Sequence, residues 1–155
     1  MGEVRFWDTS ALLKVFDLRE PDHRRARGLW AGPRSRRVRH VSSILVAIEA
    51  VRKFYRSVPA EVGTLREALE TLDLVYLDDR VLPVAWELAR RSRASGADTA
   101  IVATAVCIRR AAGDEVELIT ADAGQAALAR GEGLNVVLLA AGGTGRYGRP
   151  VRGPV

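Results

Sequence analysis

Short apolar runs alternate with longer amphipathic stretches along most of this chain. Four of the runs predict strands, at residues 3–7, 74–77, 116–120 and 134–139. Helical spacing of apolar residues predicts helices over residues 9–16, 22–30, 44–55, 60–72, 80–94, 97–113 and 125–130. Strands that alternate with helices are typical of a parallel sheet covered by helices on both faces. The sequence therefore predicts an α/β fold.

Two of the predicted helices carry apolar patterns that suggest how they pack. In residues 44–55, which follow a serine pair suited to N-capping, one apolar stripe consists of Ile44, Ile48, Val51 and Tyr55. In residues 97–113 the apolar positions run almost all the way round the helix. Such a helix is buried on most sides, so we expect it near the centre of the molecule.

Length and composition limit the class of protein. At 155 residues the chain is the size of one domain, and 48% hydrophobic with 28% charged residues is ordinary globular composition. No apolar run approaches a membrane span, and the charged N-terminus does not resemble a signal peptide, so we expect a cytoplasmic protein. The single cysteine, Cys107, rules out an internal disulfide and is expected to pack in the core.

The charge of the chain permits binding to a polyanion. The formal net charge is +5, and 22 of the 24 basic residues are arginine. Four of them cluster in one segment, at Arg34, Arg36, Arg37 and Arg39. This segment is either a loop that contacts RNA phosphates or a solvated connector, and charge runs are more often the latter.

Two acids occupy the same kind of position, directly between a strand and a helix. Asp8 follows the strand at 3–7, and Asp122 follows the strand at 116–120. The carboxyl ends of parallel strands face the ligand crevice, so an acid at this position points into a site. The alternative is that each acid only N-caps the helix that follows it.

Two more acids lie on predicted helices next to apolar residues. Glu49 is at the edge of an apolar face, although an exposed ion pair with Lys53 four residues later is an alternative role. Asp98 stands at the head of the helix at 97–113, where its alternative role is that of an N-cap.

Acids gathered in one crevice would repel one another. Such a cluster is usually neutralised by divalent cations that prefer oxygen ligands, such as Mg²⁺ or Mn²⁺. No cysteine or histidine accompanies these acids, which argues against zinc. The sequence therefore suggests a hard-cation site if the four acids converge.

Four blocks of the sequence resemble those of PIN-domain ribonucleases, and closely those of the toxins of bacterial VapBC-type toxin–antitoxin pairs. The blocks are DTSALL, SSILVAIEAVR, GADTAIVATA and LITAD. The resemblance extends from Val4 to about Leu139. Its specificity lies in the order of the blocks, because any single block is a weak signal.

The resemblance implies a fold and a site. The fold is a doubly wound five-stranded parallel sheet in the order 3-2-1-4-5, with residues 38–43 as the second strand. Residues 1–140 would form the nuclease domain and residues 141–155 a flexible basic tail. The metal-binding and catalytic acids would be Asp8, Glu49, Asp98 and Asp122, supported by the hydroxyls of Ser10 and Thr120.

The strand order also predicts which acids are not in the site. Asp78 and Asp79 follow the third strand, which lies at the sheet edge, and are expected to cap a helix.

The resemblance further implies an activity and partners. The activity is Mg²⁺- or Mn²⁺-dependent hydrolysis of RNA phosphodiester bonds, and the partners are an antitoxin protein and a second copy of the chain. An RNA-processing nuclease outside a toxin system, and an idle module that binds RNA or a partner, are the alternatives. A phospho-acceptor receiver domain and a haloacid-type phosphatase fit less well, because their additional acids and lysine are missing.

Overall fold

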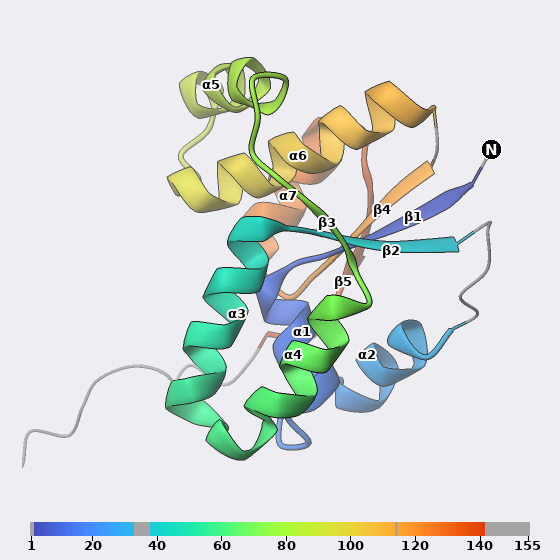
Figure 1. Cartoon of the computed structure of the whole chain (residues 1–155). Helices are drawn as coiled ribbons and strands as arrows, with labels where there is room; N and C mark the ends of the chain where they lie inside the picture. Colours follow the sequence, from blue (N-terminus) through green and yellow to red (C-terminus); the bar gives the residue numbers. More distant parts are fainter. Residues whose placement is uncertain (1, 33–37, 114, 142–155) are drawn as a thin grey trace, which may run out of the picture.

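Five parallel strands form the central sheet, in the order β3-β2-β1-β4-β5 (Figure 1). The computed structural model describes residues 2–32, 38–113 and 115–141. The strands are β1 Glu3–Trp7, β2 Val38–Ser43, β3 Asp73–Val75, β4 Glu115–Thr120 and β5 Asn135–Leu138. The α/β class and the strand order expected from the resemblance are both confirmed.

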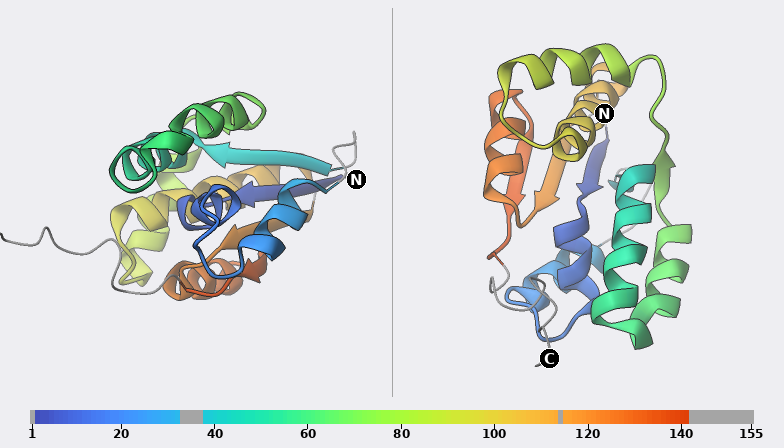
Figure 2. Two further views of the ribbon diagram at one scale, coloured as in Figure 1. Left: turned by 90° about the horizontal axis from the view of Figure 1, so that it is seen from below. Right: turned by 90° about the vertical axis from the view of Figure 1, so that its left-hand side faces the viewer.

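Helices cover both faces of the sheet (Figures 1 and 2). One layer contains α1 Thr9–Phe16, α2 His23–Trp30, α3 Ile44–Ser57 and α4 Val62–Glu70, which follows the short 3₁₀ helix η1 Pro59–Glu61. The other contains α5 Val81–Arg91, α6 Gly96–Ala112 and α7 Ala123–Gly131. Among the residues that the structure describes, no helix is long and apolar enough to cross a lipid bilayer.

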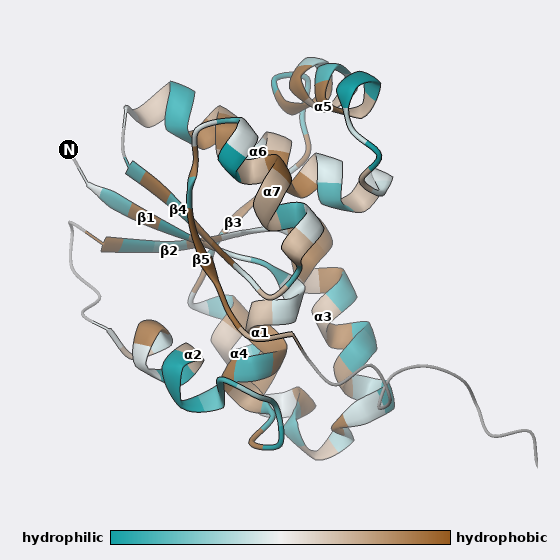
Figure 3. Ribbon diagram, turned by 180° about the vertical axis from the view of Figure 1, so that it is seen from behind, coloured by the Kyte–Doolittle hydropathy of each residue, from teal (hydrophilic) through white to brown (hydrophobic). Residues whose placement is uncertain are grey.

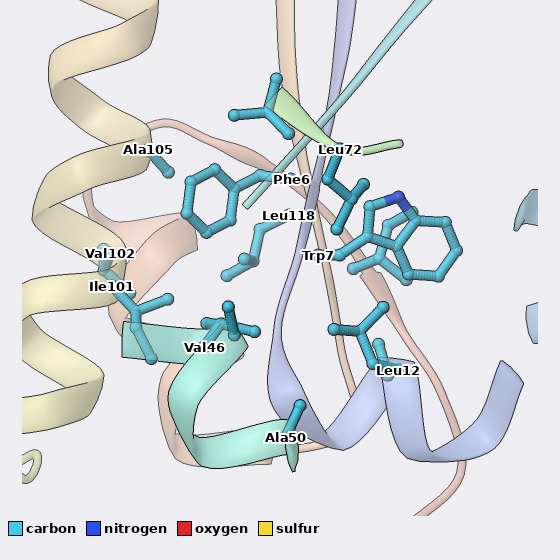
Figure 4. Close-up of a cluster of buried hydrophobic side chains, with 14 of the residues drawn as sticks. Phe6, Trp7, Leu12, Val46, Ala50, Leu72, Ile101, Val102, Ala105 and Leu118 are labelled. Carbon is cyan, nitrogen blue, oxygen red and sulfur yellow. The ribbon is translucent and has the colours of Figure 1, made fainter. Parts of the chain in front are cut away.

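The hydrophobic core lies where the two layers meet the sheet. Phe6 and Leu118, on the adjacent strands β1 and β4, are fully buried with Ile101 of α6 (Figure 4). The strand β5 is strongly hydrophobic, whereas much of α2 is hydrophilic (Figure 3). As the pattern predicted, most of the central length of α6 is buried.

Helix α3 buries a different face from the one that its longest apolar stripe suggests. Ile48 and Tyr55 are 62% and 61% exposed, whereas Val46, Ala50 and Phe54 are buried. The helix carries apolar residues on two sides, and the side with Val46, Ala50 and Phe54 is the buried one. The helical spacing is therefore confirmed, but Ile48 and Tyr55 of this stripe lie outside the core.

Two helix starts differ from the sequence-based expectation. Helix α2 begins at His23, because Asp22 has φ 60°, outside the helical region. Helix α6 begins at Gly96 with Ser95 as its N-cap, so Asp98 is in the first turn. The alternative role of Asp98 as the N-cap is therefore ruled out, because the serine three residues earlier takes that position.

Some expected features lie outside the described residues. They are Arg34, Arg36 and Arg37 of the arginine segment and all but the first residue of the proposed tail at 141–155.

Candidate functional site

Asp8 lies at the junction of β1 and α1, where the strand gives way to the helix. Its backbone N–H still donates to the Ile119 carbonyl of β4, 3.1 Å away. Its side chain accepts from the backbone N–H of Ser10 and so caps α1. The capping role and the position at the strand end therefore belong to the same residue.

Hydroxyl groups surround the Asp8 carboxylate. Asp8 Oδ2 accepts from Ser10 Oγ at 2.6 Å and from Thr120 Oγ1 at 3.1 Å. Asp8 is only 5% exposed. Burial raises the pKa of the Asp8 carboxyl above its ordinary value, and hydrogen bonds from Ser10 and Gln125 oppose this rise.

Asp122 repeats this arrangement at the end of β4. Its backbone N–H donates to Thr120 Oγ1 at 3.0 Å, and its side chain caps α7 by accepting from the Gln125 N–H at 2.8 Å. Because β1 and β4 are neighbours in the sheet, Thr120 contacts both Asp8 and Asp122.

Asp98 reaches the same region from the first turn of α6. Ser95 Oγ donates to Asp98 Oδ2 at 2.6 Å, and the Asp98 N–H donates back to Ser95 Oγ at 3.1 Å. This reciprocal pair resembles a capping box and holds the carboxylate near the start of the helix.

Glu49 approaches from α3 and has two partners. Its Oε1 lies 3.0 Å from Lys53 Nζ, the ion pair expected from the four-residue spacing. Its Oε2 accepts from Thr9 Oγ1 of α1 at 2.9 Å, a contact that the sequence did not indicate. Thr9 therefore turns Glu49 toward the end of β1.

All four acids line one pocket. Its volume is about 230 Å³, and Asp8, Glu49, Asp98 and Asp122 contribute to its wall together with Lys53. Two of the acids follow β1 and β4, and the other two lie on α3 and α6, so the fold brings together residues up to 114 positions apart, from 8 to 122. The pocket lies at the carboxyl ends of β1 and β4, where the strand order reverses.

A match to the model of a known family covers this whole arrangement. The model of the PIN domain matches residues 5–139, most of the chain. This chain belongs to the PIN domain family. The sequence-based resemblance is therefore confirmed at the level of the family.

Solved structures similar to this PIN domain include toxins of toxin–antitoxin pairs. A toxin–antitoxin complex from Klebsiella pneumoniae has a TM-score of 0.64 at 23% identity, covering 86% of this chain and 95% of that one. VapC20 from Mycobacterium tuberculosis, a toxin that cleaves the sarcin-ricin loop, has a TM-score of 0.63 at 19% identity, covering 79% and 93%. VapBC-1 from nontypeable Haemophilus influenzae has a TM-score of 0.62 at 15% identity, covering 87% and 97%.

Comparison with curated protein sequences gives no significant match.

Arg39, the described arginine of the candidate RNA segment, lies away from the acidic pocket of the PIN domain. Arg39 is the second residue of β2, at the amino end of the strand, and its guanidinium binds Asp73 at 2.9 Å. The acids gather at the opposite, carboxyl edge of the sheet. The structure therefore does not bring Arg39 to the pocket.

Sequence reasoning did not identify Gln125, which the PIN fold buries among the acids. Its Nε2 lies 3.3 Å from Asp8 Oδ1 and 3.2 Å from Asp98 Oδ1. The available signal was its spacing three residues after Asp122, the spacing of a capping box.

The pocket offers the donors of a hard-cation site. Carboxylate and hydroxyl oxygens line it, and no histidine or cysteine is among the described residues of its wall. Among the described residues of the chain, no three His, Cys, Asp or Glu side chains come close enough together to hold one ion. In this arrangement the Gln125 amide lies between two of the carboxylates, and Lys53 pairs with a third. The donor set fits Mg²⁺ or Mn²⁺ in kind.

Proposed function

We propose that this PIN domain is a Mg²⁺- or Mn²⁺-dependent endoribonuclease. The observation that carries the proposal is the convergence of Asp8, Glu49, Asp98 and Asp122 on one pocket. Each acid has a local structural role, but separate helix caps and ion pairs have no reason to face the same space. Four acids beside a single lysine favour binding of a divalent cation over a structural role alone.

The side chains of the pocket suggest how such an enzyme would work. The four acids would hold the cation, while Ser10 and Thr120 fix the orientation of Asp8 through its Oδ2. A bound divalent ion would supply positive charge for the phosphate and make an attacking water more acidic. Lys53, on the wall of the pocket, is placed to attract the RNA backbone.

We further propose that the protein is the toxin of a type II toxin–antitoxin pair, with an antitoxin protein as its partner and a homodimer as its assembly. Support comes from the similar solved structures, which include a toxin–antitoxin complex and VapBC-1. A short neighbouring gene that encodes a DNA-binding N-terminus would support this role. Growth arrest on expression, relieved by co-expression of that neighbour, would test it directly.

The activity is tested by the substitution Asp8→Asn. We expect this variant to lose Mn²⁺-dependent cleavage of single-stranded and structured RNA by at least about 100-fold while it stays folded. The variant should stay folded because Asn caps a helix about as well as Asp. It should lose cleavage because the charge that holds the cation is gone. Cleavage would be measured on gels, with chelator as the metal-free reference.

Asp79→Asn is the matched control, because Asp79 is exposed and outside the pocket. It should cleave as the wild type does. Full cleavage by Asp8→Asn would show that the site has been assigned to the wrong residues.

A further inference from the structure

Gln125 contacts three of the four pocket acids. Its backbone N–H donates to Asp122 Oδ1 at 2.8 Å, and its side-chain Nε2 donates to Asp8 Oδ1 and Asp98 Oδ1. Gln125 is 1% exposed, so its side chain is enclosed by the protein. One residue on α7 thereby links the ends of β1, β4 and α6.

The other end of the amide indicates why a glutamine is buried here. Gln125 Oε1 is buried, and no donor among the described residues reaches it. An unsatisfied buried oxygen destabilises a protein, so an apolar side chain of similar size would fill this space more favourably. Packing alone does not explain a glutamine at this position, whereas two carboxylates that need a donor do.

The orientation of the amide follows from the same contacts. If the amide were turned over, its oxygen would face Asp8 Oδ1 and Asp98 Oδ1, and three acceptors would repel one another. With the nitrogen in this place, each of its two hydrogens has an acceptor. Asp8 Oδ2 already accepts from Ser10 and Thr120, so the Gln125 amide holds the second oxygen of the same carboxylate.

We propose that Gln125 is the positioning residue of the pocket, which holds the Asp8 and Asp98 carboxylates at the separation and rotation in which they bind a divalent cation. This inference rests on the proposed function and adds a residue to it. Hydrogen bonds to metal ligands from residues behind them typically contribute 10–100-fold to metal affinity, because they fix the orientation of the ligands.

The first test is Gln125→Met, which keeps the length of the side chain and removes the donor. Titration calorimetry with Mn²⁺ should give an affinity 10–100-fold weaker than that of the wild type. In the melting temperature in EDTA, the removal of an unsatisfied buried oxygen opposes the loss of the donor between Asp8 and Asp98, so the Mn²⁺ affinity is the deciding measurement. A structural role alone would lower the melting temperature and leave the affinity unchanged.

Leu88→Met is the matched control for replacing a buried side chain with methionine. Leu88 is buried in α5 and does not line the acidic pocket. It should leave the Mn²⁺ affinity unchanged. Wild-type affinity in Gln125→Met, or a tighter one, would overturn the positioning role, since a tighter affinity would mean that the amide competes with the cation.

A second variant tests the amide bridge without any metal. Gln125→Glu keeps the shape but sets a fifth carboxylate against Asp8 and Asp98, so its melting temperature in EDTA at pH 7 should fall below that of Gln125→Met. Equal melting temperatures would show that the amide does not lie between the two acids and would overturn the proposal.

The wild-type protein separates the two proposals. If it binds Mn²⁺ and cleaves RNA while Gln125→Met does both equally well, only the role of Gln125 is overturned. If the wild type neither binds Mn²⁺ nor cleaves RNA, the proposed function fails, and the role of Gln125 toward a cation fails with it.

Discussion

At the scale of single residues, one side chain can both stabilise the fold and line the pocket. Asp8 and Asp122 each cap a helix, and both line the pocket. Glu49 pairs with Lys53 and also lines the pocket. The cap position follows the strand end, and the strand end faces the crevice, so capping and function are not exclusive alternatives at such a junction.

The burial of Asp8 has a consequence for the pH dependence of stability. A carboxyl whose pKa is raised by folding stabilises the protein below its ordinary pKa of 3.8, and this contribution is lost as the pH rises through the folded-state value. In EDTA, we therefore expect Asp8→Asn to become more stable relative to the wild type as the pH rises from 4 to 7. Each pH unit between the two pKa values corresponds to about 1.4 kcal/mol.

Thermal unfolding in EDTA across this pH range checks the prediction. Asp79→Asn, at an exposed position outside the pocket, is measured alongside as the control for an Asp-to-Asn change. A difference between Asp8→Asn and the wild type that stays constant with pH would mean that burial does not govern the pKa of Asp8.

The sequence predicted acids more readily than the groups that support them. The four acids stand out because each follows a strand or adjoins an apolar helix face. The sequence does not reveal the contacts that Gln125 makes with Asp98 and Thr9 makes with Glu49, because each contact joins two helices that only the fold brings together. A glutamine in the first turn of a helix is ordinary in sequence, and its role depends on what lies across from it.

At the scale of elements, α3 shows where periodicity is ambiguous. The helix has apolar residues on two sides, and both sides have helical spacing. The side with the large residues Ile48 and Tyr55 is the exposed one. The buried side contains the small residues Ala47 and Ala50, which allow α3 to pack closely, together with Phe54.

Two adjacent aromatic residues of α3 test this assignment. Phe54→Ala should lower the free energy of unfolding by about 3–5 kcal/mol, because it leaves a cavity in the core. Tyr55→Ala should change it by about 0.5 kcal/mol or less in the monomer, because Tyr55 is 61% exposed.

Urea unfolding of both variants at low protein concentration provides the measurement. A larger loss in Tyr55→Ala than in Phe54→Ala would reverse the two faces of the helix.

The strand β2 was expected only from the family resemblance, and the reason is physical. Its sequence, VRHVSS, has few apolar residues and follows a run of arginines. In the sheet it lies between β1 and β3, and its His40 accepts a hydrogen bond from Trp7 Nε1 at 3.0 Å. Ser42 Oγ donates to the Trp7 carbonyl at 2.7 Å. Polar side chains with buried partners thus replace the apolar pattern by which a central strand is usually recognised.

At the scale of the whole molecule, strand order decides which acids meet. Reversal of the order between β1 and β4 places the ends of these two strands side by side, although more than 100 residues separate them. Asp78 follows the edge strand β3 and has its own partners, since its carboxylate accepts from the backbone and guanidinium of Arg80. It lines a different pocket, along α5 and α6. Its carboxylate orders the turn before α5, but the N-cap of that helix is Arg80, so the expectation that Asp78 and Asp79 cap the helix is wrong.

This topology separates the proposed site from the acids that most resemble it in sequence. The strand β3 is two positions from β1, or about 10 Å at 4.8 Å per strand, which is too far to share an ion held at about 2.0–2.1 Å.

Changing Asp78 and Asp79 together to Asn should therefore leave Mn²⁺ binding unchanged. Asp98→Asn and Asp122→Asn should each abolish it, because Asn keeps the size of the side chain and one acceptor oxygen but loses the charge. Calorimetric Mn²⁺ titration of the three variants decides between them. Normal binding in either single variant, or lost binding in the double one, would mean that the fold brings a different set of acids to the cation.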